Sequence, residues 1–433
     1  MTGTLTPQQR LWRWRVLIST YVGYMGYYLT RKVFTICKKP IADDFGWELS
    51  SVSHIWTAFL LAYMVGQFIA SYFGRKGGPR MILLGGLGLS IACNVVFGLA
   101  NSYATLLVFM IINGLVQATG WPGVVGSVAQ WLRNEERGQI MGVWSTSYQL
   151  GTLLIKFYGA YLLGTYGWRW SFAGCTLATI AVWWLLYFWQ RNRPEDAGLP
   201  PIIAPHSGSG DNQQVQVANS DQITLRQYLR IAFSPIVLMM GIGYLCTKFL
   251  RYALESWLPA FLTIQGLDPA RASYYSTTFD LAGLAGVVIT GYLLDRVFRG
   301  NWAALSFFMA LGMIGGYGAV IYFGSSPLAI SVCFGVVGMM LFGPESLLNG
   351  AAAVEVAGEK NGIAVVGIVN GIASFGPIIQ EEVISALMHG DPHIGIRNTN
   401  RLYLAMSILF ACFMLVAWWR LHRTRVARSA GTG

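Results

Sequence analysis

Long apolar runs separated by short polar segments dominate the sequence. A helix that crosses a bilayer needs about 20 consecutive apolar residues. By that length we find twelve runs, at residues 16–36, 52–73, 81–100, 104–130, 138–164, 170–190, 232–262, 271–297, 302–323, 328–353, 361–388 and 400–421. The pattern therefore predicts an all-α integral membrane protein with twelve transmembrane helices.

Composition and charge support the membrane class. Of the 433 residues 54% are hydrophobic and 11% are charged, against about 25% charged in a typical soluble domain. The net charge of +11 comes from Lys and Arg in short loops, which is typical of membrane topology rather than of nucleic-acid binding. We expect a lipid bilayer and no nucleic acid as partner, with both termini cytoplasmic and a bacterial inner (plasma) membrane as location.

One polar stretch divides the chain. Residues 191–230 are rich in Pro, Gly, Ser, Asn and Gln, which indicates a linker with little structure. The stretch separates an N-terminal half, residues 1–190, from a C-terminal half, residues 231–433, each with six predicted spans. A shift of 220 positions aligns the halves without gaps over their first two spans. Such a duplication predicts two pseudo-symmetric halves with a substrate site between them.

The repeat aligns two arginines inside apolar runs. Gly23, Tyr24 and Arg31 fall against Gly243, Tyr244 and Arg251. An arginine at the centre of a spanning helix costs about 2.5 to 3.5 kcal/mol on insertion scales, so a function is expected for it. Two guanidinium forks would form a receptor for one dianion. The alternative is that each arginine only pairs with a carboxylate or reaches to the membrane interface.

Several motifs resemble those of a known family. They are GYMGYYLTRKVF (23–34), NGLVQATGWP (113–122), ERGQIMGVW (136–144), FLRYALESWLP (249–259) and FGPESLLNGAAAVE (342–355). Together they resemble the organophosphate:phosphate antiporters of the major facilitator superfamily, which include glycerol-3-phosphate, hexose-phosphate and glucose-6-phosphate transporters. The resemblance covers essentially all twelve spans and implies the major facilitator fold.

The resemblance assigns roles to four residues. Arg31 and Arg251 match the phosphate-binding pair of the family, and Lys32 matches its neighbouring basic residue. Asp280 stands where many members carry an acidic residue that pairs with that basic group. An acid at membrane depth also needs a cationic partner on physical grounds. We therefore expect Lys32 and Asp280 to form an ion pair across the two halves.

The sequence also departs from the family pattern. Gln67 stands where many bacterial members have a lysine, and Tyr148 stands where many have a histidine. Both changes make the predicted pocket less basic. Lys156, eight residues after Tyr148, lies about 12 Å further along a helix on a similar face. It could replace part of the missing charge.

Other polar and aromatic residues are weaker candidates. Tyr28 and Trp121 would line the pocket or simply pack, and Glu255, four residues after Arg251, is interpreted as an ordinary intrahelical partner. Glu381 and Glu382 are expected to be solvated at a membrane end. The remaining candidates for substrate binding are Gln149, Lys248, Asn349 and Asn370.

The predicted function is exchange of a phosphorylated sugar or glycerol phosphate for inorganic phosphate by alternating access, with a hexose phosphate such as glucose 6-phosphate as the first choice. No nucleophile–base pair, P-loop or metal cluster is evident, so we expect no enzyme activity and no cofactor. We expect a monomer. Two alternatives stay open: a membrane sensor of external sugar phosphate with little transport, and a symporter of organic carboxylates with the same fold.

Overall fold

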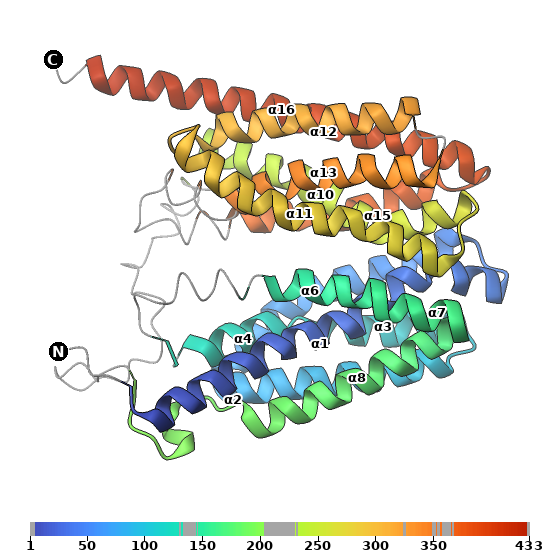
Figure 1. The fold of residues 1–433 in the computed structure, drawn as a ribbon, viewed down its shortest axis with the longest axis vertical. Helices are drawn as coiled ribbons and strands as arrows, with labels where there is room; N and C mark the ends of the chain where they lie inside the picture. Colours follow the sequence, from blue (N-terminus) through green and yellow to red (C-terminus); the bar gives the residue numbers. More distant parts are fainter. Residues whose placement is uncertain are drawn as a thin grey trace. The chain divides into compact units, whose positions relative to one another are not determined.

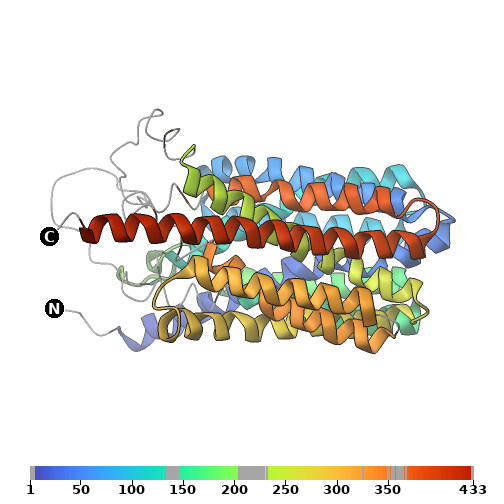
Figure 2. The same ribbon diagram turned by 90° about the horizontal axis from the view of Figure 1, so that it is seen from above.

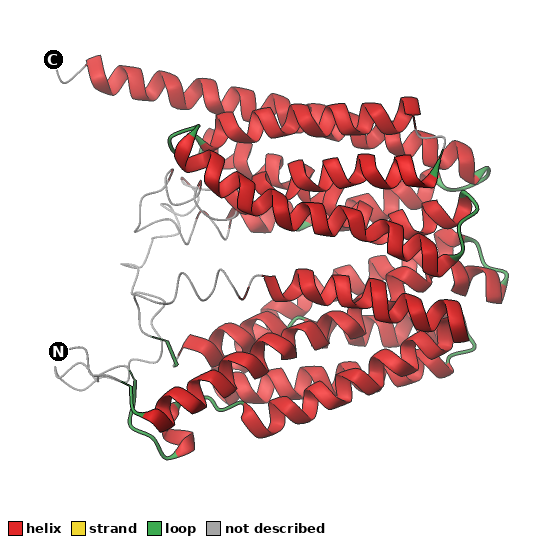
Figure 3. Cartoon of the chain, in the orientation of Figure 1, coloured by secondary structure: helices red, strands yellow, loops and turns green. Residues whose placement is uncertain are grey.

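The computed structural model describes residues 5–129, 131, 132, 144, 146–202, 230, 233–323, 326–348, 352, 356, 365 and 368–430. The described residues are helical with short connections and include no strand (Figure 3). The predicted all-α class is confirmed. Most of the predicted linker, residues 136–143 of the motif at 136–144 and Asn349 lie outside the described residues.

The chain forms two compact units (Figure 1). The first comprises Met1–Gly210 with Asp268–Tyr274, and the second comprises Asp211–Leu267 with Tyr275–Gly433.

The first unit contains the helices of the N-terminal half. They are α1 (Pro7–Phe45), α2 (Leu49–Leu99), α3 (Tyr103–Gln117), α4 (Gly120–Ala129), α6 (Thr146–Leu154), the π-helix η1 (Ile155–Gly159), α7 (Ala160–Tyr166), α8 (Trp168–Trp189) and the short 3-10 helix η2 (Pro194–Ala197). Helix α1 packs against α8 and α6, and α2 packs against α3, α4 and α8. Helix α2 contains two of the predicted spans. They are separated by a kink at Gly78, where the backbone leaves the helical region with a φ of 77°.

Local sequence explains the bounds of α1. Thr6 and Gln9 form a capping box, in which Gln9 N donates to Thr6 Oγ1 over 3.2 Å and Thr6 N donates to Gln9 Oε1 over 2.9 Å. This exchange satisfies two of the N–H groups that a helix start leaves open. The helix ends at Gly46, whose φ of 66° suits a residue without Cβ. Its 39 residues make a helix of about 58 Å, longer than the hydrocarbon core requires.

The second unit contains α10 (Pro235–Ile264), most of α11 (Pro269–Arg296), α12 (Trp302–Phe323), α13 (Pro327–Leu348), α15 (Phe375–Leu387) and α16 (Pro392–Ala430). Helix α10 packs against α13, α15 and α16, and α12 packs against α13 and α16. Figure 2 shows α16 as one continuous helix that carries the C-terminus.

Nine helices within the described residues are long and apolar enough to cross a membrane. Two of them are the parts of α2 on either side of its kink, Leu49–Gln67 and Gly78–Leu99. Helix α1 is not among the nine, because tyrosines and the Arg31–Lys32 pair lower its hydropathy. These helices make the chain a multi-pass membrane protein.

Glycines related by the repeat allow helices of each unit to approach closely. A Cβ at Gly66 of α2 would lie 2.6 Å from the backbone oxygen of Leu115 on α3. A Cβ at Gly286 of α11, 220 positions later, would overlap the backbone oxygen of Met339 on α13. Small residues at such contacts are a common means of packing membrane helices. The two repeat-related positions therefore serve the same packing purpose in both units.

Candidate functional site

Arg31 lies on α1 with only 6% of its surface exposed. Its Nε donates a hydrogen bond to Gln117 Oε1 of α3 over 3.2 Å. The guanidinium carbon lies 4.9 Å from the ring centroid of Tyr28, 4.5 Å from that of Tyr63 and 5.9 Å from that of Phe59. Aromatic faces attract a cation, by about 0.5 to 2 kcal/mol for each good contact. The first unit therefore holds the Arg31 guanidinium with an amide oxygen and three aromatic rings.

A buried polar network fixes Gln117 in this orientation. Its Nε2 donates to Ser90 Oγ over 2.7 Å, Thr30 Oγ1 over 2.8 Å and the Tyr27 carbonyl over 3.1 Å. Ser90 Oγ in turn donates to Asn113 Oδ1 over 2.7 Å. Because the amide nitrogen is committed to this network, the amide oxygen faces Arg31.

The sequence reasoning missed the role of Gln117. The available signal was that Gln117 and Asn113 both lie within one apolar run. Two amides four residues apart share one face of a helix, and polar groups at membrane depth usually have a partner or a function.

Lys32 lies near a row of stacked aromatic rings on α2, which includes rings that contact Arg31. Its Nζ lies 5.8 Å from the Trp56 ring centroid, and its exposed fraction is 3%. Trp56 stacks on Phe59 at 4.6 Å, and Phe59 stacks on Tyr63 at 6.1 Å. The adjacent cations Arg31 and Lys32 thus lie over successive rings of one helix, which supplies part of the stabilisation that their burial requires.

Three predicted pocket residues belong to one aromatic cluster. Tyr28 lies 6.0 Å from Tyr148 and 5.6 Å from Tyr24, measured between ring centroids. Tyr24 lies 5.4 Å from Trp121. Tyr28 also contacts Arg31, so the cluster extends from the arginine to α4 and α6.

The other candidates of the first unit differ in exposure. Gln67 is exposed on α2, one turn beyond Tyr63, and Gln149 is buried on α6. Lys156 is buried on the π-helix η1, with 2% of its surface exposed. Short π-helical segments occur frequently at functional sites.

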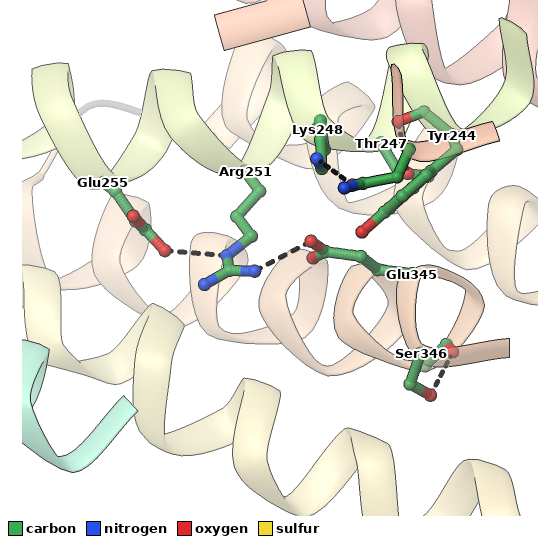
Figure 4. A network of polar contacts seen from close by, with 9 residues as sticks. Tyr244, Thr247, Lys248, Arg251, Glu255, Glu345 and Ser346 are labelled. Carbon is green, nitrogen blue, oxygen red and sulfur yellow. Dashed lines mark hydrogen bonds and ion pairs between the residues drawn. The ribbon is translucent and has the colours of Figure 1, made fainter. Parts of the chain in front are cut away.

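Arg251 of α10 is held by two carboxylates of the second unit (Figure 4). Its Nε lies 2.8 Å from Glu255 Oε1, which confirms the predicted intrahelical pair. Its Nη1 lies 2.8 Å from Glu345 Oε1 of α13. The side chain of Arg251 is 9% exposed, and those of Glu255 and Glu345 are 3% and 8% exposed. Removing one partner of such a buried pair costs about 3 to 5 kcal/mol.

Two further predicted residues meet beside Arg251. Lys248, one turn earlier on α10, donates from Nζ to Asn370 Oδ1 over 2.7 Å. The same nitrogen lies 4.8 Å from the ring centroid of Tyr244. Asp280 is buried on α11 with 3% exposure. Its pairing with Lys32, which belongs to the first unit, stays a prediction.

The expectation of a solvated Glu381 is wrong. Glu381 is fully buried, and its Oε2 accepts hydrogen bonds from Ser256 Oγ over 3.0 Å, Trp257 Nε1 over 3.1 Å and Gln380 Nε2 over 3.1 Å. Helix α15 packs against α10, so this acid faces a neighbouring helix rather than the membrane end. Glu382, the next residue, is half-buried.

A sequence model of the Major Facilitator Superfamily matches residues 20–380. Relatives include a "Probable hexose phosphate transport protein" of Chlamydia pneumoniae, 24% identical over 85% of this chain and 83% of its own. The "Membrane sensor protein UhpC" of Escherichia coli is 26% identical over 83% of each chain. The "Sugar phosphate exchanger 3" of Mus musculus is 25% identical over 86% of each chain. These names describe transport or sensing rather than catalysis.

Solved structures share the fold. A bacterial homologue of the human lysosomal transporter Spinster superposes with a TM-score of 0.76 at 16% identity, over 96% of this chain and 98% of its own. A D-xylose–proton symporter superposes with a TM-score of 0.67 at 15% identity, over 93% and 97%. The predicted major facilitator fold is confirmed.

Proposed function

We propose that this chain, which belongs to the Major Facilitator Superfamily, exchanges a phosphorylated sugar or glycerol phosphate for inorganic phosphate across a membrane. A hexose phosphate such as glucose 6-phosphate is the first substrate to test. Exchange proceeds by alternating access, in which a central site opens to one side of the bilayer and then to the other.

The observation that carries this proposal is the pair of buried arginines. Arg31 lies on the first long helix of the first unit, and Arg251 lies 220 positions later on α10 of the second unit. Each guanidinium is a planar fork of donors that matches a phosphate bidentately. Carboxylates of its own unit pair with Arg251, and a shared anionic substrate accounts for the placement of both arginines at repeat-related positions.

The relatives support the substrate class. Two of the similar proteins carry hexose phosphate transport or sugar phosphate exchange in their names. Tyr28, Tyr148 and Trp121 support a sugar as the non-phosphate part, because aromatic rings bind apolar faces and a tyrosine hydroxyl adds hydrogen bonding.

Counterflow in proteoliposomes tests the proposal. Vesicles with purified protein are loaded with radiolabelled phosphate, and a panel of phosphorylated sugars is added outside. We expect a phosphorylated sugar, and not free glucose, to accelerate loss of the label. The proposal fails if every sugar phosphate leaves the rate at that of protein-free vesicles.

A sensor is the second candidate function. The similarity to a membrane sensor protein of Escherichia coli favours it. A sensor would bind sugar phosphate in detergent, yet it would give little counterflow in the same vesicles. Binding with exchange supports the transporter, and binding without exchange supports the sensor.

The proposed location is a bacterial inner membrane, with both termini in the cytoplasm. Support comes from the basic residues at both ends of the chain, RLWRWR and RLHRTRVAR, since Lys and Arg accumulate on the cytoplasmic side. Reporter fusions at each terminus, active on one side of the membrane only, test this orientation.

A further inference from the structure

The two carboxylates around Arg251 occupy the atoms that a bound phosphate would need. A guanidinium offers two forks to an oxyanion, one made by Nε with Nη2 and one made by Nη1 with Nη2. Glu255 takes Nε and Glu345 takes Nη1, each at 2.8 Å. Each fork therefore already has a carboxylate on one of its two nitrogens, and displacement of one carboxylate frees a complete fork for phosphate.

Helix α10 holds Glu255 beside Arg251. Glu255 lies four residues after Arg251 on the same helix, so the spacing of the pair is fixed by α10 itself. Its carboxylate is also the more deeply buried of the two, with 3% of the side chain exposed.

The bond between Glu345 and Arg251 is the more easily broken of the two. Glu345 reaches Arg251 from another helix, α13, and it directly follows Pro344 in the last turn of that helix. A proline inside a helix removes a backbone hydrogen bond and loosens the adjacent turn. Within the part of the chain that the structure describes, Oε2 of Glu345 is buried and accepts no hydrogen bond. Release from Arg251 thus breaks one buried ion pair, and Oε2 adds no second bond that would hold the carboxylate in place.

A second cation, Lys248, lies near Arg251 on α10. Lys248 lies one turn before Arg251, and its Nζ donates to Asn370 Oδ1 over 2.7 Å. Figure 4 shows the Glu345 carboxylate beside the Arg251 guanidinium, with the Lys248 side chain nearby on α10. A carboxylate that leaves Arg251 would therefore still have a cation nearby on the same helix.

We propose that Glu345 is a displaceable counterion that occupies Arg251 while the site is empty and yields to the phosphate of the substrate. The inference rests on the proposed function, since it assigns Arg251 to the substrate phosphate. Glu345 competes with substrate, which keeps the affinity low enough for release on the opposite side. It is a positioning residue and does not touch the substrate.

Phosphate binding by the purified full-length protein in detergent tests this inference. Glu345→Gln removes the competing charge, and Glu255→Gln removes an equal charge from the same guanidinium. We expect Glu345→Gln to bind phosphate about tenfold more tightly than Glu255→Gln, the range of one charge-assisted hydrogen bond. In proteoliposomes the KM for phosphate should fall for Glu345→Gln, and the maximal exchange rate should fall as well, because release slows.

The outcomes separate this inference from the proposed function. Equal tightening by both variants would mean that net charge alone matters, and unchanged or weaker binding by Glu345→Gln would also overturn the inference. Neither result affects exchange by the unmodified protein. Failure of the unmodified protein to bind phosphate would end both proposals. If Glu345→Gln does not fold, Glu345→Asp replaces it: the shorter acid reaches Nη1 less well, so several-fold tighter binding is expected.

Discussion

The two units bind their buried arginines through different kinds of side chain. Arg31 donates to the neutral amide of Gln117 and lies over aromatic rings, whereas Arg251 donates to two carboxylates. Aromatic rings and an amide orient a guanidinium without cancelling its charge. A carboxylate cancels the charge and must be outcompeted by an anion.

Replacing either arginine by lysine should abolish most exchange. Lysine keeps the charge and loses the planar fork, and a bidentate site does not tolerate that change. We expect Arg31→Lys and Arg251→Lys each to lower phosphate exchange by about tenfold or more. Size-exclusion profiles and helical circular dichroism should remain those of the unmodified protein. Near-normal exchange by one variant would remove that arginine from the substrate site.

Gln117→Glu should weaken phosphate binding and preserve the fold. A carboxylate beside Nε would compete with substrate for Arg31, and the hydroxyls of Thr30 and Ser90 can turn to donate to it. We expect the Kd for phosphate to rise about tenfold, which corresponds to about 1.4 kcal/mol.

Asn113→Asp is the matched control for Gln117→Glu. It adds the same charge two hydrogen bonds further from the arginine, beyond Ser90. A smaller rise in Kd is expected. Equal losses in both variants would contradict a direct role of Gln117 toward Arg31.

The sequence predicted one neighbour of Arg251 and missed the other. Glu255 could be assigned because the helical period sets its distance from Arg251. Glu345 could not, because it lies 94 positions away and only the packing of α10 against α13 brings it close. The same reason explains Gln117, which reaches Arg31 from α3.

At the scale of helices, apolar runs predicted where the chain crosses the membrane and missed where the helices are interrupted. The run at 104–130 breaks between α3 and α4, where Tyr27 of α1 hydrogen-bonds Thr119 Oγ1 over 3.0 Å. The predicted fifth span contains the π-helix η1. Such breaks depend on tertiary contacts, which hydropathy does not record.

A pair of alanine substitutions on α11 tests the close packing of helices in the second unit. Gly286→Ala would place a Cβ on the backbone of Met339, whereas a Cβ at Gly291 of the same helix meets nothing within 4 Å. We expect Gly286→Ala to destabilise the protein by about 1 to 3 kcal/mol. Gly291→Ala should be neutral or stabilising by up to about 1 kcal/mol. Thermal unfolding in detergent measures both, and equal melting temperatures would argue against the contact.

At the scale of the whole molecule, the duplication places related residues on two units. Arg31 and Arg251 are repeat-related, while Lys32 and Asp280 are not, so the second pair breaks the symmetry. Both are buried, each with 3% exposure. Charges at membrane depth need compensation, which is the reason that we predict an ion pair of Lys32 with Asp280.

The substitution Asp280→Asn tests that ion pair. It removes the negative charge that we expect Lys32 to require, and it should lower both expression and exchange. Breaking a buried pair typically costs about 3 to 5 kcal/mol, and a water-filled cavity would reduce that cost. The double variant Lys32→Gln with Asp280→Asn removes both charges and should lose less exchange than Asp280→Asn alone. If the two losses simply add, the residues do not interact, and Asp280 must neutralise Arg31 or Arg251 instead.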